Sequence, residues 1–326
     1  MLEIDITSPA EKITYADKIF LIGSCFTEHI GRRLEELKFP VIQNPNGILF
    51  DPISVSESLN SYIDLKKYKQ ADIFYLNELW QSWNHHSFFS GMDAGNVLWN
   101  INLSQREAHE KLKCATWLII TLGSSFSYQL TEDKQPVANC HRAPGQWFNK
   151  HLLSTEETAS ALEGSIQKLL VFNPLLKIIF TISPVRHIRD GVVENNRSKA
   201  RLIEAVQQLV DKYAHVYYFP AYELVIDVLR DYRFYDVDLV HPNYAATEFV
   251  FEKFEQYFID SKSRIYMEEI KKIASCYKHK PFQPETQSHQ LFLKNSFEKV
   301  KNLQQKLPEI DFTKELTYFS KRNPEL

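Results

Sequence analysis

The stretch Lys18-Ile-Phe-Leu-Ile-Gly-Ser-Cys-Phe-Thr27 decides the fold, and it continues as Glu28-His-Ile-Gly-Arg-Arg-Leu-Glu-Glu-Leu37. Its four consecutive apolar residues, which end at Gly23, predict a short buried strand. Apolar residues then recur at helical spacing, with charged residues between them, and predict an amphipathic helix. The sequence therefore predicts a strand-to-helix elbow at residues 23–25.

An elbow of this kind brings Ser24 and Cys25 to the carboxyl end of a strand and the amino end of a helix. The unpaired backbone N–H groups and the helix dipole there stabilise negative charge. Any parallel βαβ unit contains such an elbow, so small residues at its apex also have a purely structural explanation. The two side chains are candidate nucleophiles only if a base lies nearby.

Further apolar runs separated by helical patterns indicate an α/β fold. They lie at residues 39–43, 116–122, 176–182 and 215–219. Ser154-Thr-Glu-Glu157 is a capping box that opens one of the intervening helices, and another helix is expected from about residue 198 to 213. Unbroken apolar strands alternating with helices favour a central parallel sheet covered on both faces. We expect a flavodoxin-like three-layer α/β/α sandwich with five central strands and its site beyond their carboxyl ends.

Residues from about 50 to 103 depart from this rhythm and are interpreted as a small β insertion over the sheet edge. The aromatic-rich segment 74–89 has β propensity and partial alternation, and Gly91 closes it. One interpretation is a lid or substrate wall built from Trp83, His85 and His86. The other is that the aromatic rings only pack the insertion onto the protein.

The chain is expected to have two parts, residues 1–260 and a helical appendage at 261–326. Apolar residues recur at helical spacing in the second part amid many Lys, Glu and Gln residues. The sequence Pro281-Phe-Gln-Pro284 separates two helical pieces. This appendage is expected to pack on the main domain, to mediate oligomerisation or to cover the site.

The amino-acid composition limits the kinds of molecule that the protein is expected to bind. The 326 residues are 44% hydrophobic, enough for a sizeable core, and the net charge is only −3. A near-neutral chain without a dense Lys/Arg block predicts neither nucleic-acid nor membrane binding. The acidic N-terminus lacks the features of a signal peptide, and no apolar stretch approaches the roughly 18 residues of a membrane span.

We therefore expect a cytoplasmic protein that acts on a neutral or modestly charged small molecule. Its cysteines lack C-x-x-C spacing and fit reduced thiols, and neither a metal nor another cofactor is expected. These cysteines are Cys25, Cys114, Cys140 and Cys276.

A candidate base lies far along the chain, in Asp238-Leu-Val-His241-Pro-Asn243. This segment precedes an amphipathic helix whose apolar positions include residues 246, 250, 254 and 258. The Asp-x-x-His pair thus lies on a loop, with Asn243 as the expected helix cap. The alternative is an Asp that caps the helix with a His packed beside it.

An early nucleophile and a late Asp-x-x-His resemble the SGNH (GDSL-like) hydrolase superfamily. Within it the chain is most similar to the GSCFA family, whose namesake motif here reads Gly23-Ser-Cys-Phe-Thr27. Further segments resemble that family in the expected order over residues 1–260. They are Asn44-Pro-Asn-Gly47, Trp83-Asn-His-His86, Thr121-Leu-Gly123, Val137-Ala-Asn-Cys-His-Arg142, Ser183-Pro-Val-Arg-His187 and the Asp-x-x-His segment.

The resemblance implies a hydrolase or acyltransferase that acts on an ester or acyl group, on a small molecule or a glycan. The superfamily's Gly-Asp-Ser-x-Thr pattern aligns Cys25 with the nucleophile, while a slip of one residue would restore Ser24. His241 would be the general base, and Asp238 would orient it. At a helix amino end near His241, the pKa of the Cys25 thiol is expected to be lowered.

The oxyanion hole departs from the superfamily, because Gly123-Ser-Ser-Phe126 stands where Gly-x-Asn-Asp is usual. The missing amide donor leads to an alternative function, a binding or scaffold protein whose ancestral site has decayed. If the site is active, the donor is expected among the backbone N–H of the nucleophile and several further groups. These oxyanion and substrate-binding candidates are Asn46, Gly47, His86, Gly123, Asn139, His141, Arg186 and His187. Of these, Arg186 and His187 would either hold a substrate anion or fix their own loop.

Overall fold

A central parallel sheet organises the computed structural model, which describes residues 2–321. Its strands run in the order β10-β9-β5-β1-β2, which confirms the predicted five-stranded α/β sandwich. The strands are β1 (Ile19–Gly23), β2 (Val41–Gln43), β5 (Trp117–Leu122), β9 (Lys177–Ile182) and β10 (Val216–Phe219). Because the strands are parallel, all their carboxyl ends lie at one edge.

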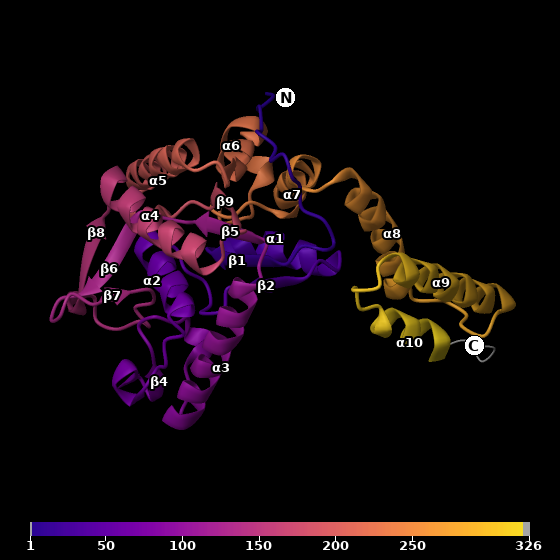
Figure 1. Cartoon of the computed structure of the whole chain (residues 1–326), viewed down its shortest axis with the longest axis horizontal. Helices are drawn as coiled ribbons and strands as arrows, with labels where there is room; N and C mark the ends of the chain where they lie inside the picture. The colour runs from indigo at the N-terminus through magenta and orange to yellow at the C-terminus, as the bar shows by residue number, and fades with distance from the viewer. Residues whose placement is uncertain (1, 322–326) are drawn as a thin grey trace.

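Helices cover both faces of this sheet, because successive residues of each strand point to opposite sides. In β1, Ile19 and Leu21 join an apolar core under α1 (Cys25–Glu36) and α7 (Tyr244–Phe258). Phe20 and Ile22 join a second core on the other face. The helices over that second core are α2 (Pro52–Ile63), α3 (Ala94–Lys113), α4 (Thr155–Phe172) and α5 (Val192–Lys212) (Figure 1).

The expected β insertion is only partly correct. A hairpin of β3 (Phe74–Leu76) and β4 (Leu79–Gln81) is present, but α2 and the start of α3 also lie within residues 50–103. Asp51 explains the start of α2, because its side chain accepts a hydrogen bond from Ser54 N–H. The segment therefore adds helices to one layer of the sandwich, with the hairpin between them.

A second small sheet was not expected from the sequence. Its three antiparallel strands are β6 (Phe126–Leu130), β7 (Pro136–Val137) and β8 (Phe148–Leu152). The remaining short elements are α6 (Ala221–Glu223), a π-helical turn (Leu224–Leu229) and 3-10 turns at Gln70–Asp72, Ser87–Phe89, Gly145–Trp147, Ile188–Asp190 and Tyr232–Phe234.

The C-terminal part is helical, as expected, with a break where Pro281–Pro284 lie. Its helices are α8 (Ser261–Lys278), α9 (Gln287–Lys306) and, beyond the two predicted pieces, α10 (Thr313–Lys321). They extend to one side of the sandwich (Figure 1). Met267, Val300 and Phe312 nevertheless belong to the same apolar core as Phe258 of α7, so this part packs on the main domain.

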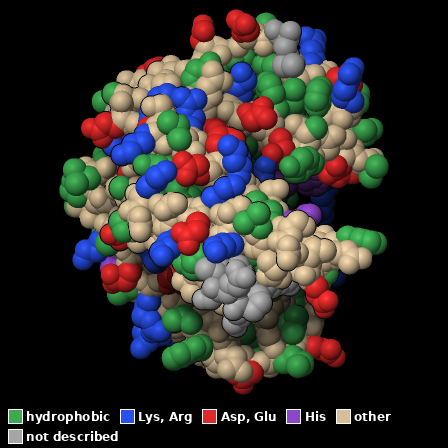
Figure 2. Space-filling view, turned by 90° about the vertical axis from the view of Figure 1, so that its right-hand side faces the viewer, with side chains coloured by type: hydrophobic (Ala, Val, Ile, Leu, Met, Phe, Trp, Pro, Cys, Tyr) green, Lys and Arg blue, Asp and Glu red, His purple; other side chains and the backbone are tan. Residues whose placement is uncertain are grey.

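The outer face of these helices carries both signs of charge. Figure 2 shows Lys and Arg side chains interspersed with Asp and Glu there. A groove of about 860 Å³ between this part and α1 and α7 has the same mixed character. Ion pairs cross between the two parts, with Lys38 Nζ 2.8 Å from Glu315 and Lys271 Nζ 3.3 Å from Glu255. Among the described residues, no helix is long and apolar enough to cross a membrane.

Candidate active site

The elbow after β1 is held tightly against β5. Gly23 has φ +140°, and a Cβ built on it would lie 2.1 Å from Thr121 O, so only glycine fits. Ser24 N–H donates to the same carbonyl at 3.0 Å. Ser24 is the N-cap of α1 and Cys25 is its first residue. The predicted strand-to-helix elbow is therefore present.

Access distinguishes the two candidate nucleophiles. Ser24 is 1% exposed, and its buried Oγ has no hydrogen-bond partner among residues 2–321. Cys25 is only half-buried. Cys25 is therefore the more accessible of the two residues in this conformation.

The expected low pKa of Cys25 is wrong. Burial raises the pKa of this thiol above its ordinary value, and Glu28 raises it further. The ammonium of Lys199 and the backbone N–H groups of Cys25 and Phe26 act in the opposite direction but do not prevail. Desolvation of a thiolate at this half-buried position thus outweighs the helix amino end.

Lys199 is a residue of the site that sequence reasoning missed. It projects from α5, is 1% exposed, and its Nζ donates to Gly123 O and Ser183 O, each at 2.6 Å. Burial lowers its pKa to about 7, and Cys25 acts to raise it. A signal was available, because Lys199 extends the apolar stripe of α5 that continues at Leu202. A lysine on a buried stripe is a candidate functional residue.

The Asp238–His241 pair forms as predicted. Asp238 Oδ2 lies 2.6 Å from His241 Nδ1, while Oδ1 accepts the backbone N–H groups of Val240 and His241. Hydrogen bonds, first that of the His241 side chain, lower the pKa of Asp238 to about 2. An ionised Asp238 places the ring proton on Nδ1 and leaves Nε2 as the acceptor. Asn243 is the cap of α7, as expected, and accepts from Ala246 N–H.

The loop that carries this pair lies close enough to α1 for the charge of His241 to act on His29. His29, one helical turn after Cys25, has a pKa lowered by partial desolvation, by Arg32 and also by the charge of His241. Arg186 fixes the loop from the other side. Its backbone N–H donates to Val240 O at 3.2 Å, and its Nη1 donates to Leu239 O at 3.1 Å. Of the two interpretations of Arg186, its contacts are those of a loop anchor.

His187 lies beside the buried lysine. Its backbone N–H donates to Asn195 Oδ1, and its ring packs edge-on against Phe126. Burial, followed by the charge of Lys199, lowers its pKa to about 4. His187 Nε2 is buried without a hydrogen-bond partner in the described part of the chain. His187 is therefore a neutral imidazole with a buried ring nitrogen that is unpartnered within residues 2–321.

Two backbone groups proposed as oxyanion donors are already in use. Gly47 N–H donates to Asn44 O at 2.7 Å, and Gly123 N–H donates to Phe50 O at 2.8 Å. Both N–H groups are thus engaged in this conformation, and their role at an oxyanion stays a prediction. Asn46 instead anchors α2, because its Nδ2 donates to Ser58 Oγ at 3.1 Å.

The side chains proposed from residues 137–142 are also engaged. Asn139 Oδ1 accepts His141 N–H at 2.9 Å. The ring nitrogens of His141 lie 2.8 Å from Ser82 O and 3.2 Å from Ser87 Oγ. His141 thus holds the loop against the insertion with both ring nitrogens. The hydrogen bond of Asn139 uses its side-chain oxygen, so the role of its amide nitrogen as an oxyanion donor stays a prediction.

Some residues of the insertion border a groove, as a substrate wall would, and others only pack against their neighbours. His86 contacts Gly47 so closely that a Cβ on the glycine would meet it at 2.1 Å. His86, Phe88 and Phe89 border a groove of about 730 Å³, hereafter the β2 groove, which also meets the turn after β2.

The other two wall candidates only pack the insertion. Trp83 stacks on Phe74 at 3.6 Å between ring centroids. His85 is 1% exposed and lies against Ser82.

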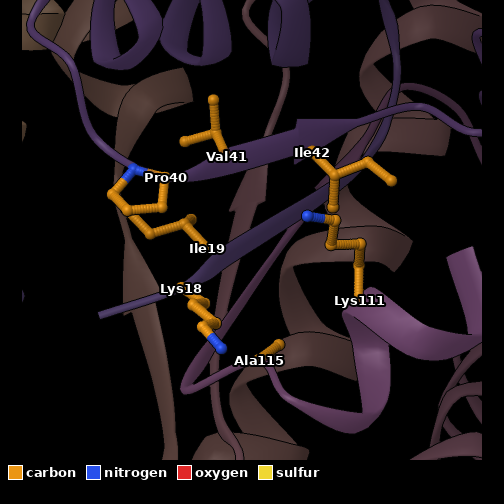
Figure 3. Close-up of a pocket in the computed structure, with 7 residues that line it drawn as sticks. All are labelled: Lys18, Ile19, Pro40, Val41, Ile42, Lys111 and Ala115. Carbon is orange, nitrogen blue, oxygen red and sulfur yellow. The ribbon is translucent and has the colours of Figure 1, made fainter. Parts of the chain in front are cut away.

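A further small pocket lies away from this site. Lys18, Ile19 and Val41 line it with Lys111 of α3, in a volume of about 120 Å³ (Figure 3). It is at the amino ends of β1 and β2, opposite the elbow. Within residues 2–321, no cluster of three or more His, Cys, Asp or Glu side chains has the arrangement of a metal site.

Comparison with known proteins gives two matches. The family model described as GSCFA family matches residues 18–254, and the one described as GSCFA domain protein, C-terminal domain, matches residues 270–325. No curated protein matches the chain.

Proposed function

Because the first match covers most of its 326 residues, the chain belongs to the GSCFA family, and we propose that it is an SGNH-like hydrolase or acyltransferase. Its substrate would be an ester or acyl group on a small molecule or a glycan. The observation that carries the proposal is the hydrogen bond of 2.6 Å between Asp238 and His241, on a loop near the helix that begins at Cys25. A cytoplasmic location belongs to the same proposal and is supported by the spacing of the cysteines.

In the proposed reaction, Cys25 Sγ attacks the carbonyl carbon of the ester. His241 Nε2 takes the thiol proton, and Asp238 stabilises the imidazolium. The bond from carbon to the alcohol oxygen then breaks, and His241 returns the proton to the departing alcohol. Water or an acceptor hydroxyl attacks the thioester, giving an acid or a new ester and restoring the thiol.

Two features of the elbow support this chemistry. When Lys199 is protonated, its ammonium stabilises the Cys25 thiolate and opposes the effect of burial. The backbone N–H groups of Cys25 and Phe26, at the start of α1, are the donors that we assign to the oxyanion. They would replace the missing Asn of the superfamily.

A second candidate function is a binding or scaffold protein with a decayed site. It is favoured by one observation, the use of the Gly47 and Gly123 N–H groups in hydrogen bonds to backbone carbonyls. An SGNH fold without the usual oxyanion donors keeps a crevice but loses stabilisation of the transition state.

Turnover of acyl esters and thioesters by matched variants tests the proposal. Cys25→Ala should abolish kcat/KM, and His241→Ala should lower it by about 10²-fold to 10⁴-fold. Ser24→Ala, which removes only the buried hydroxyl, should retain activity within about tenfold. The exposed Cys114→Ala is the control for loss of a thiol.

Two results would contradict the proposed reaction with Cys25 as the nucleophile. If Ser24→Ala loses activity while Cys25→Ala keeps it, the nucleophile is the serine. If no acyl compound is turned over and no variant changes anything, the binding function takes its place.

A further inference from the structure

The β2 groove opens directly beside the elbow. Asn44, which lines it, accepts a hydrogen bond from Gly23 N–H at 2.9 Å, and Gly23 immediately precedes Ser24. Glu28, on α1, lines the same groove and acts electrostatically on Cys25. A molecule with its reacting carbon at Cys25 can therefore extend into this groove.

The far end of the groove is apolar. It lies between α3 and the 3-10 turn Ser87–Phe89, two elements in contact. Phe88 is 84% exposed and Leu103, from α3, is 47% exposed, which leaves two large apolar side chains facing solvent. Phe89 and Ile48 complete this end. Such residues gain free energy when an apolar ligand group covers them.

The charges along the groove are acidic. Glu28 on α1 and Glu107, one turn after Leu103 on α3, both line the groove. No Lys or Arg is among the residues that line the groove within the described chain. These two carboxylates would therefore disfavour a carboxylate or phosphate ligand relative to an uncharged one.

We propose that the β2 groove binds the apolar acyl chain of an uncharged ester, with the ester carbonyl at Cys25. This inference deepens the proposed function and rests on it for the identity of the reacting group. Its volume of about 730 Å³ is within the range of small-molecule sites. Phe88 and Leu103 would contact the chain, and Glu28 and Glu107 would exclude anions.

Equilibrium binding tests the groove without requiring turnover. Unreactive N-methyl alkanamides of two, four, six and eight carbons should bind the full-length protein with rising affinity in calorimetric titrations. The expected gain is about fourfold per buried methylene, and the carboxylate of equal length should bind at least several-fold more weakly than the amide.

Variants of the groove residues test whether the amides bind in the β2 groove. Leu103→Gln and Phe88→Ser should each flatten the chain-length dependence, whereas Leu175→Gln, at an exposed leucine elsewhere, should not. Glu107→Gln should narrow the difference between amide and carboxylate, whereas Glu132→Gln on the β6–β7 turn should leave it unchanged.

The outcomes separate this inference from the proposed function. Wild-type affinities that do not depend on chain length, or a dependence that survives both apolar variants, would overturn the groove assignment. If amides bind as expected but no ester is turned over, the groove stands and the hydrolase proposal fails. If esters are turned over without chain-length preference and the amides do not bind, the hydrolase proposal stands and the groove assignment fails.

Discussion

Cys25 and Lys199 are two ionisable groups that burial affects in opposite directions. Burial raises the pKa of the thiol and lowers that of the ammonium to about 7, while each charge favours the other. Because the pKa of the thiol lies above that of the ammonium, the neutral thiol is favoured over the thiolate–ammonium pair near neutral pH. At this scale, the reactivity of the elbow depends on a lysine that comes from another element.

Alkylation of Cys25 by iodoacetamide, followed by peptide mass spectrometry, measures this dependence. Because the pKa of the thiol is raised, labelling should be slow at pH 7 and should increase at alkaline pH. Lys199→Met should move the midpoint to higher pH, and the exposed Lys168→Met should leave it in place. A wild-type midpoint below pH 8, or no shift in Lys199→Met, would refute the coupling.

A second prediction at the residue scale concerns the stability of the folded protein at acid pH, and it rests on His85. Burial, and then Lys66, lowers its pKa to about 3, so the folded protein keeps this imidazole neutral. Below pH 6.5 the unfolded chain binds a proton that the folded chain does not, and stability falls as the pH drops towards 3. The slope from this group reaches about 1.4 kcal/mol per pH unit.

Urea unfolding at several pH values checks this. His85→Gln should show a shallower loss of stability between pH 6.5 and 3, while the exposed His279→Gln should keep the wild-type slope. Equal slopes in wild type and His85→Gln would mean that His85 titrates normally.

The elbow is the element on which the site depends. Gly23 cannot accept a side chain, because its φ is +140° and a Cβ would lie 2.1 Å from Thr121 O. Gly23→Ala should therefore lower the free energy of unfolding by about 3 kcal/mol or more. Gly164→Ala, in a helix with no atom near its Cβ, should raise it by about 0.5–1 kcal/mol. Denaturant titration measures both, and a neutral Gly23→Ala would contradict the close approach of β1 to β5.

The loop before α7 is an element held from several directions. Arg186 joins its carbonyls to the segment after β9, and its guanidinium lies 4.2 Å from the ring centroid of Tyr235. Asn243 Nδ2 donates to Arg233 O at 2.7 Å, so the same residue caps the helix and closes the loop. These contacts, and not the sequence spacing alone, fix the loop that carries His241.

At the scale of the whole molecule, one apolar core joins the sandwich to the C-terminal helices. Phe258 of α7 and Phe312, before α10, belong to it, and both are fully buried. Calorimetry should therefore record one cooperative unfolding transition with equal calorimetric and van 't Hoff enthalpies.

Phe312→Ala should lower the temperature of that single transition, at a cost of about 3–5 kcal/mol. Phe282→Ala, where the side chain is 97% exposed, should not. Two transitions, of which Phe312→Ala shifts only one, would show that the two parts unfold independently.

The sequence by itself determined the features that depend on neighbours in the chain. Apolar runs predicted the strands, and the Ser154 capping box and the Asn243 cap formed as expected. The Asp238–His241 hydrogen bond joins residues only three apart, so local spacing was enough to predict it.

Only the tertiary structure decided the character of the site. The pKa of Cys25 depends on burial by several elements, and Lys199 meets Gly123 across 76 residues of chain. The N–H of Gly123 likewise has its partner in Phe50, on a different segment. Burial and electrostatic coupling depend on groups that folding brings together, whereas sequence patterns report on residues within a few turns of one another.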